Sequence, residues 1–462
     1  MNSREASTER AIQRRGSRFR WWVLALIFAL YMIASADRAN IGIVLPDLQR
    51  HFGLSNSAMG AVVSLFFTFY ALGQIPSAFL VKRFGLRRIM PLSILLTSLM
   101  TAAHGLVNTA LALRLARIGL GLAEAPIAIA SITAINNWFP PREKGLAGGI
   151  FMASTKLGPV IVPPLGALVI VAFGWHWVFI LFAIPGLLLP FLWLRYVPDD
   201  PAESPRVDEV ELALIRDRRV LPAADAVRTA AAVSKNAAKD RFAWLDRISR
   251  VREVTPLRRS ADVFRSWNVW GVSLSYFVLI GITNVILAWL PKYLAEVKGY
   301  PIMKVGLVAS APFVGAVVGN MLGGWLSDRV LGGRRKPLMM LSCLATVVMM
   351  NLLRFAPGTL LIVVTLFFLT GLLLSVGFAL YGIFPSSLTT SDTFPIATSL
   401  LNTCGQIGGA VLPLVTGIIL DHGDWGDVFL TLSGCSAVAF FLLLTVAEPR
   451  ASVDPTQSKD TA

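Results

Sequence analysis

The chain has 462 residues, of which 55% are hydrophobic and only 15% are charged, and its mean hydropathy is +0.66. A soluble domain is nearer a quarter charged, so this composition excludes an ordinary soluble protein and indicates a chain that lies in lipid. The net charge of +15 alone would suit nucleic-acid binding. However, the charges lie in short segments between apolar stretches, as topology signals do. We therefore expect a membrane protein with no nucleic-acid partner.

Twelve apolar stretches are long enough to cross a bilayer as helices. The first follows a basic N-terminus and continues to about Pro46 without an early cleavage site, so we expect a retained helix rather than a signal peptide. The expected spans are 21–46, 58–80, 87–107, 110–136, 145–172, 176–197, 267–292, 304–327, 337–355, 359–386, 394–420 and 427–447. The fold class expected is an all-α membrane protein of two six-helix bundles.

The spans divide the chain into a tail, two bundles, a central loop and a second tail. The expected segments are 1–20, 21–197, 198–265, 266–447 and 448–462, of which the second and fourth are the bundles. The central loop carries 14 Lys/Arg and 12 Asp/Glu, so we expect one or two surface helices and much disorder there. With the N-terminus inside, the cytoplasmic segments hold 33 of the 42 Lys/Arg. This bias predicts the inner membrane with both termini cytoplasmic.

An internal repeat relates the two bundles. The loop at 324–336 reads Gly-Trp-Leu-Ser-Asp-Arg followed by glycines and a basic cluster, and the loop at 78–88 has the same layout, with Ala78 and Lys82 in place of its glycine and aspartate. The second loop resembles the signature of the major facilitator superfamily, which implies transport by two bundles that rock about a central site. The resemblance implies a conformational latch at Arg83, Gly85, Gly324, Asp328 and Arg329.

Five ionisable residues stand out inside the first-half spans: Asp37, Arg38, Arg117, Glu124 and Lys156. Such residues are costly in lipid and are functional candidates by default. Arg117 and Glu124 are seven residues apart, so they share one face of a helix. Three cations against two carboxylates leave a charge of about +1, which suits a small anion. Structural ion pairs that fix helix packing are the alternative.

The second half offers neutral polar groups instead, and its spans hold Asn284, Asn320, Tyr381, Asn402 and Gln406. Among these, Asn402 and Gln406 are our candidates for substrate contact. Three cysteines lie in apolar stretches without metal-like spacing, and the histidines lie near loop ends. We therefore expect no metal, no cofactor and no enzyme activity, and we expect a monomer.

Several stretches together resemble the anion:cation symporter family, and in particular its proton-coupled carriers of galactonate-type sugar acids. They are Asp37-Arg38-Ala-Asn40, Tyr70 to Pro76, Arg117 with Glu124-Ala-Pro126, Trp138 to Glu143, and Gly174 to Phe179. The resemblance implies that Arg38 and Tyr70 bind the substrate carboxylate and that Asn402 contacts it from the other half. It also implies that Asp37 and Glu124 take up protons, with Arg117 tuning Glu124.

Two departures from the family pattern concern the substrate. Ser35 stands where the family often has a tyrosine, and Lys156 stands where sugar-acid carriers tend to have a neutral polar residue. An added cation beside Arg38 favours a solute with more negative charge or fewer hydroxyls, such as a dicarboxylate, an aromatic acid or a sulfonated acid.

Two other classes of function remain open. A glycine-proline pair, Gly158-Pro159, partly matches the motif of drug exporters, so a proton-coupled exporter of drugs or metabolites is the alternative to an importer. A kinked helix relieved by its neighbours would also account for this glycine-proline pair. A membrane enzyme or receptor is disfavoured, because no H-E-x-x-H or nucleophile motif is found. The function expected is import of a small organic anion with protons.

Overall fold

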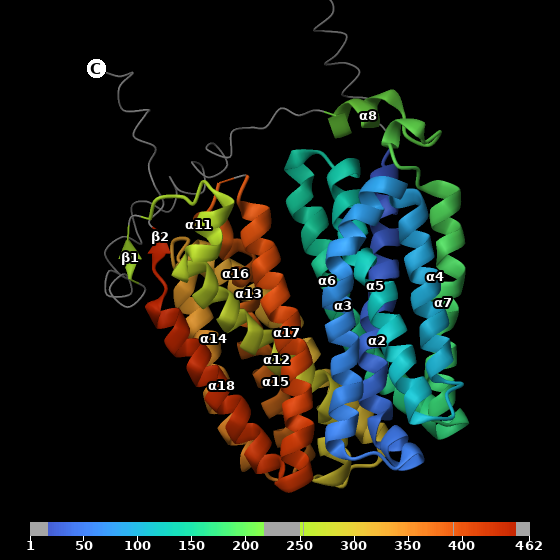
Figure 1. Ribbon diagram of the computed structural model, residues 1–462, viewed down its shortest axis with the longest axis vertical. Helices are drawn as coiled ribbons and strands as arrows, with labels where there is room; N and C mark the ends of the chain where they lie inside the picture. The colour runs from blue at the N-terminus through green and yellow to red at the C-terminus, as the bar shows by residue number, and fades with distance from the viewer. Residues whose placement is uncertain (1–16, 217–249, 253, 391, 450–462) are drawn as a thin grey trace, which may run out of the picture. The chain divides into compact units, whose positions relative to one another are not determined.

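The computed structural model describes residues 17–216, 250–252, 254–390 and 392–449. These residues are almost entirely helical, and twelve helices in them are long and apolar enough to cross a membrane (Figure 1). The first half contributes α2 (Phe19–Phe52), α3 (Asn56–Phe84), α4 (Leu86–His104), α5 (Ala110–Trp138), α6 (Pro141–Phe173) and α7 (Trp175–Tyr196). The second half contributes α12 (Trp267–Glu296), α13 (Ile302–Trp325), α14 (Lys336–Arg354), α15 (Leu360–Val376), α17 (Phe394–His422) and α18 (Trp425–Thr445).

The helix ends follow from local chemistry. Gly53, at a φ of 60°, ends α2 in the left-handed region that glycine adopts most readily. Ser55 begins α3 by accepting a hydrogen bond from the N–H of Ala58 at 3.2 Å, and Thr109 caps α5 in the same way. The 34 residues of α2 would extend over about 50 Å, so this helix is longer than the roughly 30 Å hydrocarbon core.

Two expected spans are more irregular than their hydropathy predicts. The helix α13 continues as a π-helical turn, Leu326–Val330, and the tenth span is broken at Gly377. Beyond that break lie the short helix α16 (Phe378–Ile383) and the 3₁₀ turn Phe384–Ser387. An added Cβ on Gly377 would lie 2.9 Å from the Ser342 side chain, so packing against α14 requires a glycine there.

The central segment forms short elements only. They are the 3₁₀ turn Pro201–Glu203, α8 (Glu209–Arg216), α11 (Ser260–Arg265) and the strand β1 (Val251–Arg252). The strand pairs in parallel with β2 (Glu448–Pro449), which follows α18 and which sequence analysis did not predict. The disorder expected in this loop falls mainly on residues 217–249, and these lie outside the described part of the chain, as do residues 1–16 and 450–462.

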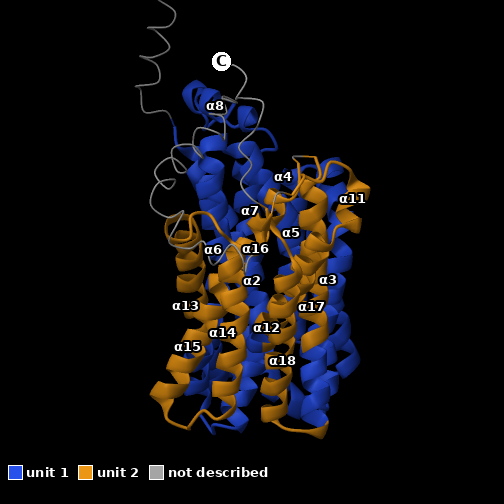
Figure 2. Ribbon diagram, turned by 90° about the vertical axis from the view of Figure 1, so that its left-hand side faces the viewer, with its two compact units in different colours: residues 1–226, 286–310, 413–421 blue, residues 227–285, 311–412, 422–462 orange. Residues whose placement is uncertain are grey.

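The chain divides into two compact units (Figure 2). Unit 1 comprises residues 1–226, 286–310 and 413–421, and unit 2 comprises residues 227–285, 311–412 and 422–462. In unit 1, α3 packs on α5, α2 packs on α6, and α4 packs on both α5 and α7. In unit 2, α14 packs on α15 and α18. The division of the sequence into domains at 197 and 266 stays a prediction.

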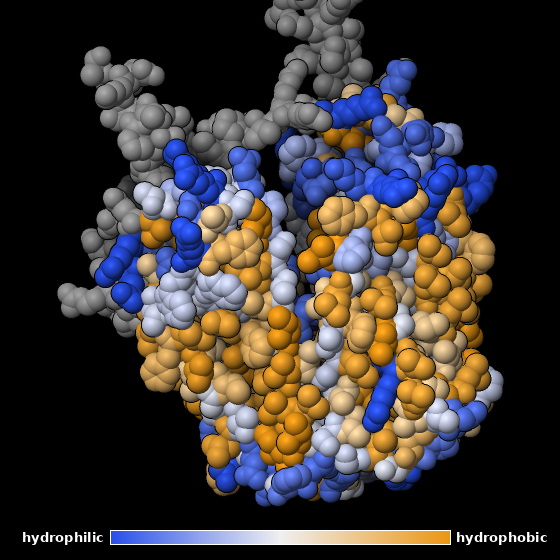
Figure 3. Space-filling view, viewed as in Figure 1, coloured by the Kyte–Doolittle hydropathy of each residue, from blue (hydrophilic) through white to orange (hydrophobic). Residues whose placement is uncertain are grey.

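The lateral surface of the helices is apolar. Among the side chains more than 70% exposed are Ile75, Met321, Phe355 and Leu361. On the face shown in Figure 3, hydrophobic side chains fill the middle of each unit and hydrophilic ones gather at the helix ends. A water-facing surface of this kind would be unstable, whereas lipid accepts it at no cost. The twelve helices therefore belong in a bilayer.

Candidate functional site

Unit 1 contains a buried ion pair between neighbouring helices. Nε of Arg38 on α2 donates a hydrogen bond of 2.6 Å to Oε1 of Glu124 on α5, and Nη2 of Arg38 contacts the same oxygen. The Glu124 side chain has no solvent exposure, and that of Arg38 has 19%. The second carboxylate oxygen of Glu124 accepts no hydrogen bond from the described residues. The pair is thus buried but incompletely satisfied.

Three aromatic rings surround the Arg38 guanidinium. Its central carbon lies 4.9 Å from the ring centre of Tyr70, 5.8 Å from that of Tyr31 and 5.9 Å from that of Phe66. The Tyr31 hydroxyl also accepts a long hydrogen bond of 3.5 Å from Nη2. Aromatic faces attract a cation, most strongly where water is excluded. These rings therefore hold the guanidinium in place on α2.

Tyr31 contacts the Arg38 guanidinium, and sequence analysis did not identify it as a site residue. The family's tyrosine position holds Ser35, and Tyr31 lies one turn earlier on the same helix, where its ring contacts Phe151 of α6 at 4.6 Å between centres. The signal was available in the sequence, because Tyr31 precedes Arg38 by seven residues, two helical turns. Tyr31 therefore provides an aromatic contact to Arg38 from the same helix.

The helices α2 and α6 meet closely at Ser35. The Ser35 hydroxyl lies 3.0 Å from the carbonyl oxygen of Ser154. An added Cβ on Gly158 would lie 2.6 Å from the backbone nitrogen of Ala36, which is closer than real Cβ atoms come. A tyrosine at position 35 would have to displace α6. This close contact also brings Lys156 near enough to Arg38 for their positive charges to repel each other.

Asp37 and Arg117 form the inner part of the same cluster, and each is only 2% exposed. Nδ2 of Asn40 donates to Oδ1 of Asp37 at 3.3 Å. Oδ2 of Asp37, and Nε and Nη2 of Arg117, have no hydrogen-bond partner among the described residues. The Asp37 carboxylate is repelled by Glu124 and attracted by Arg117 and Arg38. All five charged residues predicted in the first half therefore interact in unit 1.

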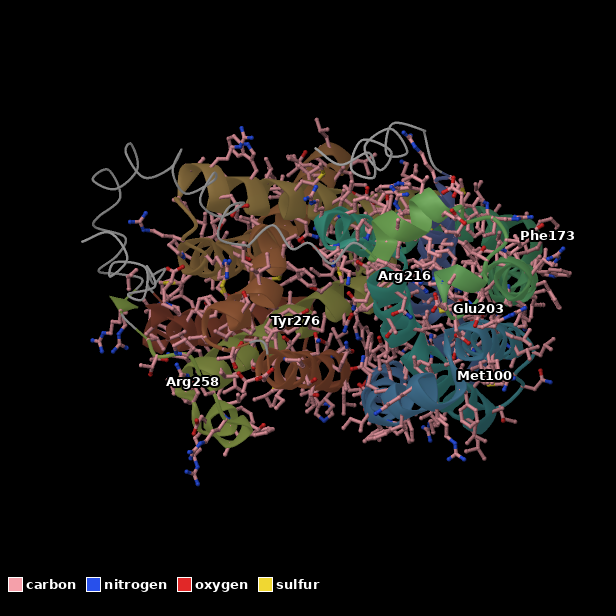
Figure 4. The ribbon with its side chains drawn as sticks, turned by 90° about the horizontal axis from the view of Figure 1, so that it is seen from above. Met100, Phe173, Glu203, Arg216, Arg258 and Tyr276 are labelled. Carbon is pink, nitrogen blue, oxygen red and sulfur yellow. The ribbon has the colours of Figure 1, made fainter. Side chains whose placement is uncertain are left out.

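The two predicted contacts of the second half lie on α17 in unit 2. Asn402 is exposed there, and Gln406 is half-buried. Unit 2 also contains a buried hydroxyl pair, in which the oxygens of Ser275 and Tyr381 lie 2.6 Å apart. Figure 4 shows Tyr276, the neighbour of Ser275, among the helices of this unit. The roles of Asn402 and Gln406 stay predictions.

The predicted latch residues lie at the helix ends. Gly85 has a φ of 79°, and Arg83 is exposed, with its guanidinium 5.4 Å from the ring centre of Phe84. In unit 2, Asp328 and Arg329 are exposed, and an added Cβ on Gly324 would meet nothing within 4 Å. The conformational role assigned to these five residues stays a prediction.

Two carboxylates that sequence analysis missed stabilise these ends. In unit 1, Oδ1 of Asp199 accepts a hydrogen bond of 2.8 Å from the N–H of Arg87. In unit 2, Oε1 of Glu448 accepts one of 2.6 Å from the N–H of Arg335. Each carboxylate follows the last helix of its half by three residues and caps the third helix of that half. The internal repeat thus extends to these caps, whose equal spacing was visible in the sequence.

No group of three or more His, Cys, Asp and Glu residues able to hold a metal ion occurs in residues 17–216, 250–252, 254–390 and 392–449. The cluster around Arg38 instead combines fixed cations with carboxylates, a donor set that suits an organic anion and protons.

Comparison with known proteins agrees with this chemistry. The sequence profile described as Major Facilitator Superfamily matches residues 27–308 and 302–461. The chain is 30% identical to the probable galactarate/D-glucarate transporter GudP of Bacillus subtilis, over 95% of this chain and 96% of that protein. It is 27% identical to a D-galactonate transporter of Escherichia coli, over 92% and 96% of the two chains. It is 30% identical to the probable sulfoacetate transporter SauU of Cupriavidus necator, over 67% and 65%.

Solved structures support the fold alone. A D-xylose-proton symporter aligns with a TM-score of 0.69 at 16% identity, over 92% of this chain and 98% of that one. A bacterial homologue of the human lysosomal transporter Spinster, in an inward-facing and occupied conformation, aligns with a TM-score of 0.67 at 16% identity, over 92% and 94%.

Proposed function

Because the chain belongs to the major facilitator superfamily of transporters, we propose that it imports a small organic anion by proton symport with alternating access. The observation that carries the proposal is the buried ion pair of Arg38 and Glu124. In this pair, a carboxylate of the protein already binds the guanidinium that is proposed to bind the carboxylate of the substrate. The relatives named for sugar acids and sulfoacetate support an anionic substrate.

Coupling follows from competition for Arg38. When Glu124 takes up a proton, it loses the charge that holds the guanidinium, and the substrate carboxylate replaces it. One proton and one carboxylate therefore enter together, and the number of buried charges at Arg38 does not change. When the site opens inward, loss of the proton restores the pair and expels the substrate. Asp37 is the second proton acceptor, and Arg117 adjusts both carboxylates.

We propose further that the preferred substrate carries two negative charges. Lys156 supplies a cation close to Arg38, so a solute with acidic groups at both ends would relieve the repulsion between the two side chains. Galactarate, glucarate and sulfoacetate, for which relatives are named, each have two acidic groups. The same chemistry excludes most cationic drugs as substrates.

The proposed orientation places the end of unit 1 that bears α8 in the cytoplasm, with both termini inside and the protein in the cell inner membrane. Figure 4 looks onto this end and labels Glu203, which ends the 3₁₀ turn, and Arg216, the last residue of α8. The excess of Lys/Arg in the segments on this side supports the orientation. We take the monomer as the transporting unit, with protons, substrate and lipid as its only partners.

Transport in proteoliposomes tests the proposal. Purified protein is given glucarate, sulfoacetate or galactonate under an inward proton gradient, and accumulation is compared with that in vesicles treated with a protonophore. Accumulation driven by the inward gradient and abolished by Arg38→Gln would support symport. Accumulation driven only by an outward gradient would identify an exporter. Uptake that ignores the gradient would refute proton coupling.

A further inference from the structure

A ladder of polar side chains lines the inner face of α4. Thr97, Ser98, Thr101 and His104 are each at most 1% exposed. Thr97, Thr101 and His104 are three or four residues apart and share one side of the helix, with Ser98 next to Thr97, whereas the nearby Leu99 is 45% exposed. His104 is the last residue of α4, and Thr97 lies about 10 Å further along the helix axis.

The ladder has hydrogen-bonding capacity that the protein does not use. Oγ1 of Thr97, Oγ of Ser98, Oγ1 of Thr101 and Nε2 of His104 have no partner among the described residues. Buried polar atoms are nearly always satisfied, and ordered water is the usual partner when protein groups are not. The unpartnered atoms of Thr97, Thr101 and His104 therefore favour a hydrated chamber beside α4, whereas Ser98 packs against α7, where a Cβ added on Gly186 would collide with its Oγ.

The chamber adjoins the charged cluster at two residues of the ladder, Thr101 and His104. The Thr101 hydroxyl interacts favourably with the Asp37 carboxylate, although the geometry falls short of a direct hydrogen bond. The His104 ring interacts with the charge of Arg117 across the contact between α4 and α5. Asp37 and Arg117 also keep unpartnered polar atoms, so these four side chains are the candidates to line one hydrated space.

The mixture of donors and acceptors selects water over a metal ion. Nδ1 of His104 lies 2.6 Å from the carbonyl oxygen of Met100, so Nδ1 carries the hydrogen and Nε2 is an acceptor. Arg117 offers only donors, so it cannot ligate a metal ion. A water molecule can accept from Arg117 and donate to His104, and hydroxyls can do both. The ring of Phe179 on α7 closes the far side of His104.

We propose that this chamber, lined by α2, α4 and α5, holds a single-file chain of hydrogen-bonded water molecules. This chain, the water file, delivers protons to Asp37. The file runs from His104, at the end of α4 that faces outside in the proposed orientation, past Thr101 to Oδ2 of Asp37. A proton added to the outer water passes along the hydrogen bonds, and the last water donates one to Oδ2, which becomes a carboxylic acid. Rotation of the waters then resets the file.

The file separates the proton path from the substrate path. Asp37 and Arg38 are consecutive, so their side chains leave α2 about 100° apart. Asp37 faces the chamber with Thr101 and Arg117, and Arg38 faces the aromatic rings and Glu124. Protons therefore reach the inner carboxylate without passing through the substrate site. The inference rests on the proposed function only for the direction of flow.

Infrared spectroscopy of the reconstituted protein tests the inference without any substrate. The carboxylic C=O band that Asp37→Asn removes is followed after transfer from H₂O to D₂O. We expect Thr97→Val with Thr101→Val to slow deuteration of that band by at least about tenfold, which corresponds to about 1.4 kcal/mol. Thr133→Val is the matched control, since its hydroxyl already donates to the carbonyl oxygen of Ile129 at 2.8 Å.

The results of this experiment and of an experimental structure distinguish whether the water file exists. Deuteration of the Asp37 band at the wild-type rate in the double variant would overturn the proposal, as would the absence of an Asp37-dependent band at any pH at which the protein is folded. An experimental structure with ordered water between Thr101 and Asp37 would support it. Slowed deuteration in vesicles that transport no organic anion would leave the water file standing and refute the substrate assignment instead.

Discussion

Glu124 binds Arg38 through a single carboxylate oxygen, Oε1, and leaves Oε2 without a hydrogen bond from the described residues. A guanidinium binds a carboxylate most strongly through two parallel hydrogen bonds, one to each oxygen. The pair is therefore weaker than a bidentate pair at the same buried position. In the proposed transport cycle, an incoming carboxylate that uses both oxygens replaces it. The partial pairing of Arg38 therefore fits the proposed role of a reversible substrate anchor.

Replacement of Glu124 should uncouple transport. In Glu124→Gln the side chain no longer gains or loses a proton, so we expect accumulation against a gradient to be abolished while exchange of internal for external substrate continues. Uptake and counterflow in the same proteoliposomes measure the two. Glu203→Gln, at an exposed position, is the matched control. Full accumulation by Glu124→Gln would exclude this residue from coupling.

Removal of the Lys156 charge should alter selectivity more than activity. We expect Lys156→Gln to lower the apparent affinity for a dianion such as glucarate by about tenfold, which corresponds to about 1.4 kcal/mol, and to affect galactonate less. The reason is that a second acidic group loses its cation. Competition between the two acids measures the ratio, with the exposed Lys304 changed to Gln as the control. An unchanged ratio would contradict the dianion proposal.

The ring of Tyr70 should matter more than its hydroxyl. Tyr70→Phe keeps the aromatic face 4.9 Å from the Arg38 guanidinium, and Tyr70→Leu removes it. A buried contact of this kind contributes about 1–2 kcal/mol, so we expect the apparent affinity to fall by about five- to thirtyfold in Tyr70→Leu. We expect it to change little in Tyr70→Phe. An equal loss in both variants would show that the hydroxyl binds the substrate directly.

Glu448 should make stability depend on pH. Burial raises the pKa of this carboxyl above its ordinary value, although the N–H groups of Arg335 and Lys336 oppose the shift. The folded state then holds the proton more tightly than the unfolded state. Stability is therefore lost as the pH rises from the ordinary glutamate pKa through the raised one. Thermal unfolding in detergent should show a smaller fall over that interval in Glu448→Gln than in the wild type, with the exposed Glu209→Gln behaving as wild type.

The elements predicted from sequence are those that short-range signals determine. Twelve spans were found because a bilayer needs long apolar runs, and the charged cluster was found because charges in such runs are rare. The break at Gly377 and the pairing of β1 with β2 were missed, because each depends on a packing partner more than 30 residues away. The α4 ladder was missed because threonine and serine in a span are unremarkable until burial leaves them unpartnered.

The close contact between α2 and α6 gives the last prediction. Gly158→Ala would push a Cβ to 2.6 Å from the backbone nitrogen of Ala36 and closer still to the Ser35 hydroxyl, so either α6 moves or the helices separate. Overpacking of this kind costs about 1–3 kcal/mol. Gly149→Ala in the same helix is the matched control, since nothing lies within 4 Å of its added Cβ, and alanine favours a helix. We expect the melting temperature to fall in Gly158→Ala and to hold or rise in Gly149→Ala. Because Lys156 is carried by the same stretch of α6, Gly158→Ala should also weaken binding of dianions. Equal stability of the two variants would show that α6 does not lie against Ser35 in the membrane.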